Sequence, residues 1–205
     1  MDSTPTTIDP TVFLLVRHAQ TTWNKEQRHT GSMEVPLSPT AGAQIERLTR
    51  SLLKHPIAAV YSSPLTRCQL TVRPLVEQLG LKVHLDDRLI ERDLGSWEGK
   101  SPADLLPTHP GYEFPKSAYT GEFRITGAET IEELEGRIRN FLSSVHEHHP
   151  GKQVLVATHS GVIWTAVHRI VSNPPEDFLW PDNCSLSTIV SHGNHFMFDS
   201  FEAGR

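Results

Sequence analysis

The chain has 205 residues and a formal net charge of −5, with 37% hydrophobic and 21% charged residues. This length can bury one full hydrophobic core, and the mild negative charge does not favour binding to nucleic acid or an anionic membrane. The two cysteines, Cys68 and Cys184, are far apart and form no CxxC pair, which argues against a disulfide scaffold and a zinc site. The segment Met1-Asp2-Ser3-Thr4-Pro5 lacks the positive charge and apolar core typical of a signal peptide, and no apolar run approaches the ~20 residues of a membrane span. We expect a cytoplasmic protein with no nucleic-acid or membrane partner.

Hydrophobic periodicity and turn residues divide the chain into alternating strands and helices. Residues 1–10 carry two prolines and several threonines and are predicted to form a flexible leader, so a single domain is expected over residues 11–205. In chain order the patterns predict a strand at 11–16, a helix opened by Ser38-Pro39, a strand at 58–62, a helix at 65–79 ending at Gly80, a strand at 83–85, a helix at 129–148, a strand at 154–158, a helix at 162–171, and strands at 185–191 and 195–201 around a Gly193-Asn194 turn.

Residues 86–127 show little periodicity but hold several aromatic side chains. Such segments are typically functional loops or caps, and we expect a cap that sets specificity at about residues 101–127. Trp97 and the cap aromatics Tyr112, Phe114, Tyr119 and Phe123 fit either a core or a substrate entrance, and the sequence does not decide between them. The alternation of strands and helices predicts an α/β fold, a three-layer α/β/α sandwich around a mainly parallel sheet.

Three predicted strands end in polar side chains. Arg17 and His18 follow the first strand, Arg67 follows the second, and His159 follows the strand at 154–158. The carboxyl ends of neighbouring parallel strands meet at one edge of a sheet, where ligands bind. Guanidinium groups and the N–H groups of a helix start match phosphate oxygens, and an imidazole can act as a nucleophile. These residues predict a phosphate site that contains a nucleophile.

The chain resembles the histidine phosphatase superfamily, in its phosphoglycerate-mutase-like branch, over residues 12–191. The first strand ends in Arg17-His18-Ala19, where the family has Arg-His-Gly. The resemblance implies the same α/β/α fold, phosphoryl transfer without a metal or organic cofactor, and often a homodimer. Further matching segments, in the family's order, are Thr30-Gly31, Pro36-Leu37-Ser38, Ser62-Ser63-Pro64-Leu65 with Arg67, Leu89-Ile90-Glu91 and Thr158-His159-Ser160-Gly161.

The resemblance also implies roles for individual residues. His18 would be the nucleophile that becomes phosphohistidine, and Arg17 and Arg67 would hold the phosphoryl oxygens and favour the unprotonated imidazole. His159 would hydrogen-bond the transferring phosphoryl group, and Glu91 would protonate the leaving group and then accept a proton from water. The substrate-binding positions implied beside Arg17 and Arg67 are Asn24, Thr30, Gly31 and Ser160.

Some positions leave alternatives open. Ala19 replaces the family's Gly, which requires a negative φ or room for a methyl group. Glu34 stands where many members have Asp, so a local cap made by that carboxylate is in question. Glu98 is a second candidate for the acid, and the charged run Glu91-Arg92-Asp93 is also typical of a solvated surface.

Three functions remain to be compared. The compact region at 101–127 favours a phosphatase that hydrolyses a small phosphorylated metabolite, because family mutases usually carry a longer insertion there. A phosphoglycerate mutase would use the same core residues. A non-catalytic module that binds a phosphate ligand is the third alternative, although all core residues of the catalytic pattern are present.

Overall fold

The structure is a computed structural model that describes residues 9–178 and 180–204, so residues 1–8 of the predicted leader lie outside the described residues. The described chain contains a six-stranded sheet in the order β3-β2-β4-β1-β5-β6. Strands β3, β2, β4 and β1 run parallel, whereas β5 and β6 pair antiparallel. The predicted mainly parallel sheet is thus confirmed. The strands are β1 (Thr11–Arg17), β2 (Ile57–Ser62), β3 (Val83–Leu85), β4 (Gln153–Thr158), β5 (Leu186–His192) and β6 (His195–Glu202).

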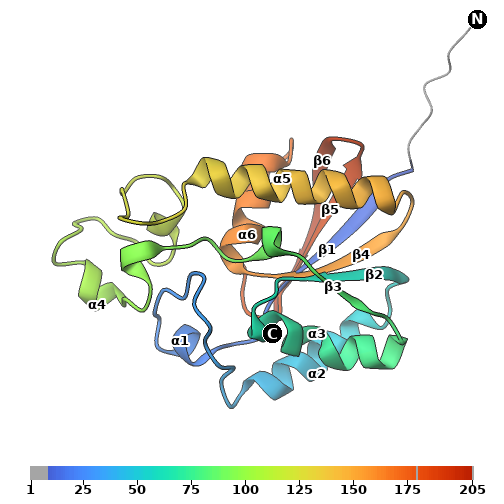
Figure 1. Cartoon of the computed structure of the whole chain (residues 1–205), viewed down its shortest axis with the longest axis horizontal. Helices are drawn as coiled ribbons and strands as arrows, with labels where there is room; N and C mark the ends of the chain where they lie inside the picture. The colour runs from blue at the N-terminus through green and yellow to red at the C-terminus, as the bar shows by residue number, and fades with distance from the viewer. Residues whose placement is uncertain (1–8, 179, 205) are drawn as a thin grey trace, which may run out of the picture.

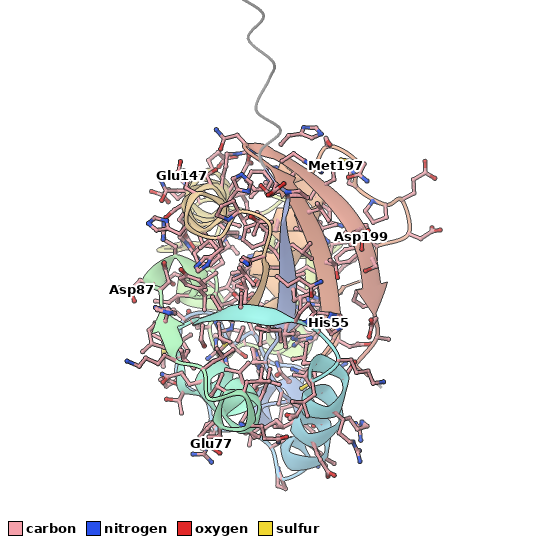
Figure 2. The ribbon with its side chains drawn as sticks, turned by 90° about the vertical axis from the view of Figure 1, so that its right-hand side faces the viewer. His55, Glu77, Asp87, Glu147, Met197 and Asp199 are labelled. Atoms are coloured by element: carbon pink, nitrogen blue, oxygen red, sulfur yellow. The ribbon has the colours of Figure 1, made fainter. Side chains whose placement is uncertain are left out.

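Helices cover both faces of the sheet (Figure 1). Helices α5 (Ile131–His148) and α6 (Ser160–Thr165) pack on one face, and α2 (Ala41–Leu52) and α3 (Thr66–Leu79) pack on the other. Successive side chains of a strand point to opposite faces, so Phe13 of β1 joins the core under α5 and Leu14 joins the core under α3. Figure 2 shows α5 near Glu147 and α3 near Glu77 on opposite sides of the strands, which completes the three predicted layers.

Two helix ends follow their sequence signals, and two helix starts differ from the prediction. A capping box between Thr130 and Glu133 opens α5, and Gly80 closes α3 with a φ of 64°. The helix predicted to open at Ser38-Pro39 begins at Ala41, with Thr40 as its N-cap. The helix predicted at 162–171 instead begins at Ser160 and changes into a π-helical turn, η4 (Ala166–Ile170). The reason is that His159 already has an extended backbone and acts as the N-cap, so the helix starts directly at the end of β4.

The aperiodic region contains short helical turns that periodicity could not detect. They are α4 (Pro102–Leu105) and the single 3-10 turns η1 (Asp87–Leu89), η2 (Gly95–Trp97) and η3 (Lys116–Ala118). Trp97, Tyr112 and Tyr119 are buried in the larger core cluster, so these aromatic side chains anchor the region to the sheet. Its role as a specificity cap stays a prediction.

A further short helix, α1 (Thr22–Lys25), lies at the same end of the molecule as α4 (Figure 1). Thr21 and Asn24 form its capping box, and four residues are too few to produce a hydrophobic period. Among residues 9–178 and 180–204, no helix has both the length and the apolar character needed to cross a membrane.

Candidate active site

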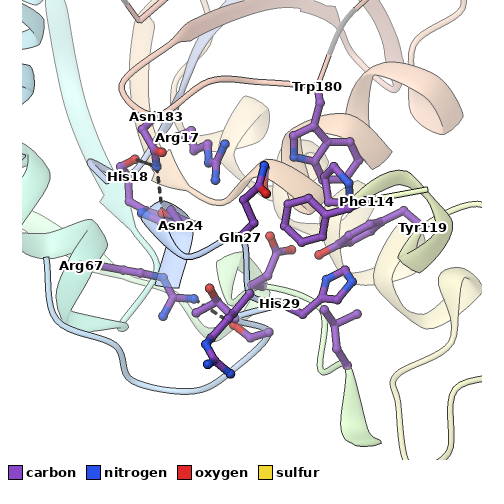
Figure 3. Close-up of a pocket in the computed structure, with 17 residues that line it drawn as sticks. Arg17, His18, Asn24, Gln27, His29, Arg67, Phe114, Tyr119, Trp180 and Asn183 are labelled. Atoms are coloured by element: carbon purple, nitrogen blue, oxygen red, sulfur yellow. Dashed lines mark hydrogen bonds between the residues drawn. The ribbon is translucent and has the colours of Figure 1, made fainter. Parts of the chain in front are cut away.

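A pocket opens where β1 ends, between the loop that contains α1, the N-terminus of α3, the cap and the segment before β5 (Figure 3). Every site residue predicted from the sequence lines this pocket except His159. The parallel strands β1, β4 and β2 are adjacent in the sheet, so their carboxyl ends deliver Arg17 and His18, Ser160 and Arg67 to the same place. The expected convergence of the strand ends is therefore present.

The His18 imidazole is held in one tautomer. Its Nδ1 lies 2.8 Å from the carbonyl oxygen of Ala19. A carbonyl can only accept, so Nδ1 carries the proton and donates it, and Nε2 of the neutral ring is unprotonated. Burial, followed by the charges of Arg67 and Arg17, places the pKa of His18 well below its usual value. At neutral pH the ring therefore has a free lone pair on Nε2.

Arg17 is fixed by the segment that precedes β5. Its Nη1 donates to the carbonyl oxygen of Pro181 (2.6 Å), and its own carbonyl accepts from the N–H of Cys184 (3.0 Å). Its Nε is buried and finds no hydrogen-bond partner among the described residues. Burial lowers the pKa of Arg17 to about 10, which still leaves the group cationic at neutral pH. A buried cation with an unused donor beside a pocket is well suited to bind an anion.

Arg67 connects three parts of the site. Its Nη1 and Nη2 donate to the carbonyl oxygens of Met33 (2.6 Å) and Gly31 (2.9 Å), and its Nε donates to Nδ1 of His159 (3.3 Å). The side chain is 1% exposed. Arg67 therefore shapes the loop around Gly31 while placing its charge beside His18.

His159 is fully buried and lies behind His18, not on the pocket wall. Because its Nδ1 accepts from Arg67, its Nε2 carries the proton and donates to Oγ of Ser63 (2.9 Å). Its ring centroid lies 5.2 Å from that of His18 in an edge-on arrangement. In this geometry His159 supports His18, and direct contact with a phosphoryl group would require its Nε2–H to leave Ser63.

Glu91 provides a buried carboxyl group at the pocket. Its Oε2 accepts from the N–H of Gly161 and its Oε1 from the N–H of Arg92, both at 2.9 Å. Burial raises the pKa of Glu91 even though these two N–H groups oppose the shift. A carboxyl group with a raised pKa next to a nucleophile can serve as a proton donor.

Glu98 and Arg92, which belong to the same charged region, make different contacts from those of Glu91. Glu98 does not line the pocket; its Oε1 accepts from the N–H (2.7 Å) and Oγ (3.1 Å) of Ser32 and so braces the loop after Gly31. Arg92 is 6% exposed and Glu91 is buried as well, so the alternative of a solvated charged surface is wrong for these two residues; Asp93 is exposed. Its Nε donates to the carbonyl oxygen of Glu129 (2.7 Å), which anchors it inside the fold.

Both departures from the family pattern have local explanations. Ala19 is fully buried and its φ is not positive, so a methyl group causes no backbone strain there. Oε1 of Glu34 accepts from the N–H (2.9 Å) and Oγ1 (3.1 Å) of Thr66, the first residue of α3. The longer carboxylate thus still caps the helix that carries Arg67.

The predicted substrate-binding residues occupy different parts of the wall. Asn24 belongs to α1 and Ser160 is the first residue of α6, whereas Thr30 and Gly31 belong to the loop that follows α1. Oγ1 of Thr30 is buried without a hydrogen-bond partner among the described residues. Gly31 has a φ of 54°, and a Cβ there would lie 2.0 Å from Oε1 of Glu98, so another residue would be strained and would displace the Glu98 side chain.

Trp180 and Asn183 also line the pocket and were not predicted. Both precede β5, which runs antiparallel to β1. An antiparallel neighbour of β1 begins beside the carboxyl end of β1, so the residues before it belong to the same edge of the sheet. Trp180 and Asn183 could have been predicted only if β5 had been placed next to β1. Hydrophobic periodicity alone does not give the order of the strands in the sheet.

The comparisons with known proteins agree with this geometry. The family model described as the histidine phosphatase superfamily (branch 1) matches residues 13–203. The chain belongs to this superfamily. Phosphoserine phosphatase 1 of Hydrogenobacter thermophilus is 31% identical over 182 residues, covering 86% of this chain and 85% of the relative. A relative from Salmonella choleraesuis, named "Probable phosphoglycerate mutase", is 30% identical over 177 residues, covering 85% and 82%.

Solved structures show the same fold. The mycobacterial glucosyl-3-phosphoglycerate phosphatase, in its complex with VO3, superposes with a TM-score of 0.82 at 25% identity, covering 95% of this chain and 99% of that one. YhfR of Bacillus stearothermophilus gives a TM-score of 0.80 at 25% identity, covering 92% and 95%. The histidine phosphatase therefore matches these proteins over nearly its whole length.

Proposed function

We propose that this histidine phosphatase is a phosphoric monoester hydrolase that acts on a small phosphorylated metabolite through a phosphohistidine at His18. The observation that carries the proposal is the hydrogen bond from Nδ1 of His18 to the carbonyl of Ala19, which leaves Nε2 unprotonated beside Arg17 and Arg67. An in-line phosphoryl transfer needs a positioned nucleophile and positive charge around the moving group, and this arrangement offers both.

In the first step, Nε2 of His18 attacks phosphorus and the bond to the ester oxygen breaks. Glu91 gives its proton to the leaving oxygen, and Arg17 and Arg67 balance the charge on the phosphoryl oxygens. We assign His159 a further stabilising hydrogen bond, which becomes available when its Nε2–H turns from Ser63 to the phosphoryl group.

In the second step, water attacks the phosphohistidine and gives a proton to Glu91. The bond between nitrogen and phosphorus breaks, inorganic phosphate leaves, and His18 and Glu91 return to their starting states. The same carboxyl group thus acts first as acid and then as base, which requires a pKa above that of an ordinary glutamate, as its burial provides.

The charges in the pocket favour a phosphatase over a mutase. Besides Arg17 and Arg67, the pocket wall contains Arg28, whose Nε pairs with the Glu26 carboxylate (2.8 Å) and whose Nη1 donates to the carbonyl of Gly99 (2.8 Å). A bisphosphorylated intermediate needs a second strong anion site, and one partly neutralised arginine is a weak one. The names of the relatives include both activities, so the assay must distinguish them.

Phosphate release from a panel of phosphorylated metabolites tests the proposal. The wild-type protein is expected to release phosphate, His18→Ala is expected to be inactive, and His148→Ala, at an exposed position on α5, serves as the matched control with unchanged activity. No release from any ester, with His18→Ala indistinguishable from wild type in phosphate binding, would instead support the non-catalytic binding module.

Incubation with 3-phosphoglycerate and 2,3-bisphosphoglycerate tests the mutase alternative. We expect phosphate release to exceed isomerisation; faster isomerisation would assign the mutase activity. The homodimer and the cytoplasmic location expected from the sequence stay predictions, to be checked by light scattering of the purified chain and by cell fractionation.

A further inference from the structure

Tyr119 is a buried tyrosine at the pocket that no step of the proposed reaction uses. It follows η3 in the cap, is 3% exposed, and points its hydroxyl group into the pocket (Figure 3). Burial and the nearby Glu91 carboxyl group raise the pKa of Tyr119 well above its usual value. The cap residue thus lies next to the proposed general acid.

Gly161 brings the two side chains together. A Cβ at residue 161 would lie 2.0 Å from Cε1 and 2.4 Å from Cζ of Tyr119, and 2.5 Å from Oε1 of Glu91. Only a residue without a side chain leaves this space free, and Gly161 also donates its N–H to Oε2 of Glu91. The Tyr119 ring and the Glu91 carboxyl group therefore both pack against Gly161, near the start of α6.

Arg92 fixes the neighbouring cap backbone. Its Nη1 donates to the carbonyl oxygen of Ala118, and its guanidinium carbon lies 5.9 Å from the ring centroid of Tyr119. Because Arg92 directly follows Glu91, the same short stretch of chain carries the acid and holds the cap residue that faces it.

We propose that Tyr119 is a positioning residue for Glu91. Its hydroxyl donates a hydrogen bond to the carboxyl group and orients it toward the leaving group. Glu91 is therefore correctly oriented only when the cap segment that carries Tyr119 is packed against α6. This inference rests on the proposed phosphatase function and on the role of Glu91 within it. Tyr119 transfers no proton to substrate in this scheme.

The charged environment of Glu91 sets the expected pH response. Arg17 from β1, Arg67 from α3 and Arg137 from α5 all act on it, besides Arg92 and Tyr119 themselves. Removing the tyrosine hydroxyl leaves these cations in place but takes away a donor to the ionised carboxylate. Since a donor stabilises the ionised form, its loss raises the pKa of Glu91, and the alkaline limb of activity moves to higher pH.

The test compares Tyr119→Phe with Tyr112→Phe on two esters. Tyr112 is a second buried cap tyrosine, but its hydroxyl bonds Nε2 of His29 (2.6 Å) and it does not line the pocket. β-Glycerophosphate has a poor leaving group that needs a proton, and p-nitrophenyl phosphate does not. For Tyr119→Phe we expect kcat to fall about tenfold on β-glycerophosphate, a part of the full effect of a general acid, and to stay within about twofold on p-nitrophenyl phosphate.

Gly161→Ala supplies a second variant, because its methyl group pushes the Tyr119 ring and the Glu91 carboxyl group apart, and it is expected to show the same dependence on the leaving group. Equal losses on both esters in Tyr119→Phe, or the same selective loss in Tyr112→Phe, would overturn the inference and leave the phosphatase function intact. A wild-type protein that hydrolyses neither ester would overturn the proposed function itself.

Discussion

Asn183 donates a hydrogen bond from its Nδ2 to Oδ1 of Asn24 over 3.1 Å, across 159 residues of sequence. The same Nδ2 donates to the carbonyl oxygen of His18 (2.9 Å), and both bonds are drawn in Figure 3. Oδ1 of Asn24 also accepts from the N–H of Thr21 (3.0 Å). With its oxygen engaged twice, Asn24 presents its NH2 group to the pocket, which is the polarity that an anion requires.

Substitution of Asn183 tests this arrangement. We expect Asn183→Ala to raise KM about tenfold, equivalent to about 1.4 kcal/mol, with a smaller change in kcat. Asn183→Asp has nearly the same shape but cannot donate and adds a negative charge, so its KM should rise further. Inhibition by vanadate gives the same ranking without turnover. Unchanged KM and vanadate inhibition in both variants would refute a role for Asn183 in anion binding.

Substitutions of Glu91 and Glu98 should have different effects, the first on the rate of hydrolysis and the second on stability. Glu91→Gln is expected to slow hydrolysis of β-glycerophosphate by about 10²-fold or more, with a much smaller effect on p-nitrophenyl phosphate. Glu98→Gln weakens the bonds to Ser32 and should cost about 1 kcal/mol of unfolding free energy, while the leaving-group dependence of the rate is unchanged. Denaturant unfolding and steady-state rates measure the two effects. If Glu98→Gln instead slowed hydrolysis of β-glycerophosphate selectively, Glu98 and not Glu91 would be the general acid.

The pH dependence of His18 follows from its surroundings. Burial, Arg67 and Arg17 lower its pKa, and a protonated imidazole cannot attack, so activity is present above this pKa and is lost as the pH falls through it. Arg67→Gln removes one cation and should raise the pKa of His18, whereas Arg67→Lys keeps the charge and should leave it low. An NMR titration of the His18 ring measures this directly. The same pKa in all three proteins would contradict the electrostatic cause.

The strand ends that carry most of the site residues could be predicted from the sequence, because a strand end has a local signal in the hydrophobic pattern. The apolar runs before Arg17 and His159 fix where β1 and β4 end, and parallel pairing then brings these ends together. The resemblance predicts Glu91 as the acid, but the distinction between Glu91 and Glu98 depends on burial and contacts, which no local pattern contains. Likewise the burial of Arg92 follows from distant partners in the cap and at Glu129.

Other parts of the site depend on strand order and on contacts between distant segments. Asn183 reaches the pocket only because β5 lies antiparallel next to β1, and Tyr119 only because the cap folds over α6. His159 was expected to face the phosphoryl group, but Arg67 and Ser63 hold it behind His18. Such competition between hydrogen-bond partners is set by tertiary structure, so the sequence predicts the residue and not its orientation.

Ala19 offers a test of a residue that departs from the family pattern. Ala19→Gly restores the family residue but removes a buried methyl group and adds backbone freedom to the unfolded chain. We expect a loss of about 1 kcal/mol in unfolding free energy with unchanged kcat. Thermal or denaturant unfolding beside steady-state kinetics measures both quantities. A gain in stability would show that the methyl group is strained in its buried position.

The central claim is that His18 carries the phosphoryl group. The most direct measurement is mass spectrometry of the protein denatured at alkaline pH during turnover, because phosphohistidine is stable in base and labile in acid. The account predicts one phosphoryl group, localised to the peptide that contains His18 and absent in His18→Ala. A phosphoryl group on another residue, or an unchanged phosphoenzyme in His18→Ala, would contradict it.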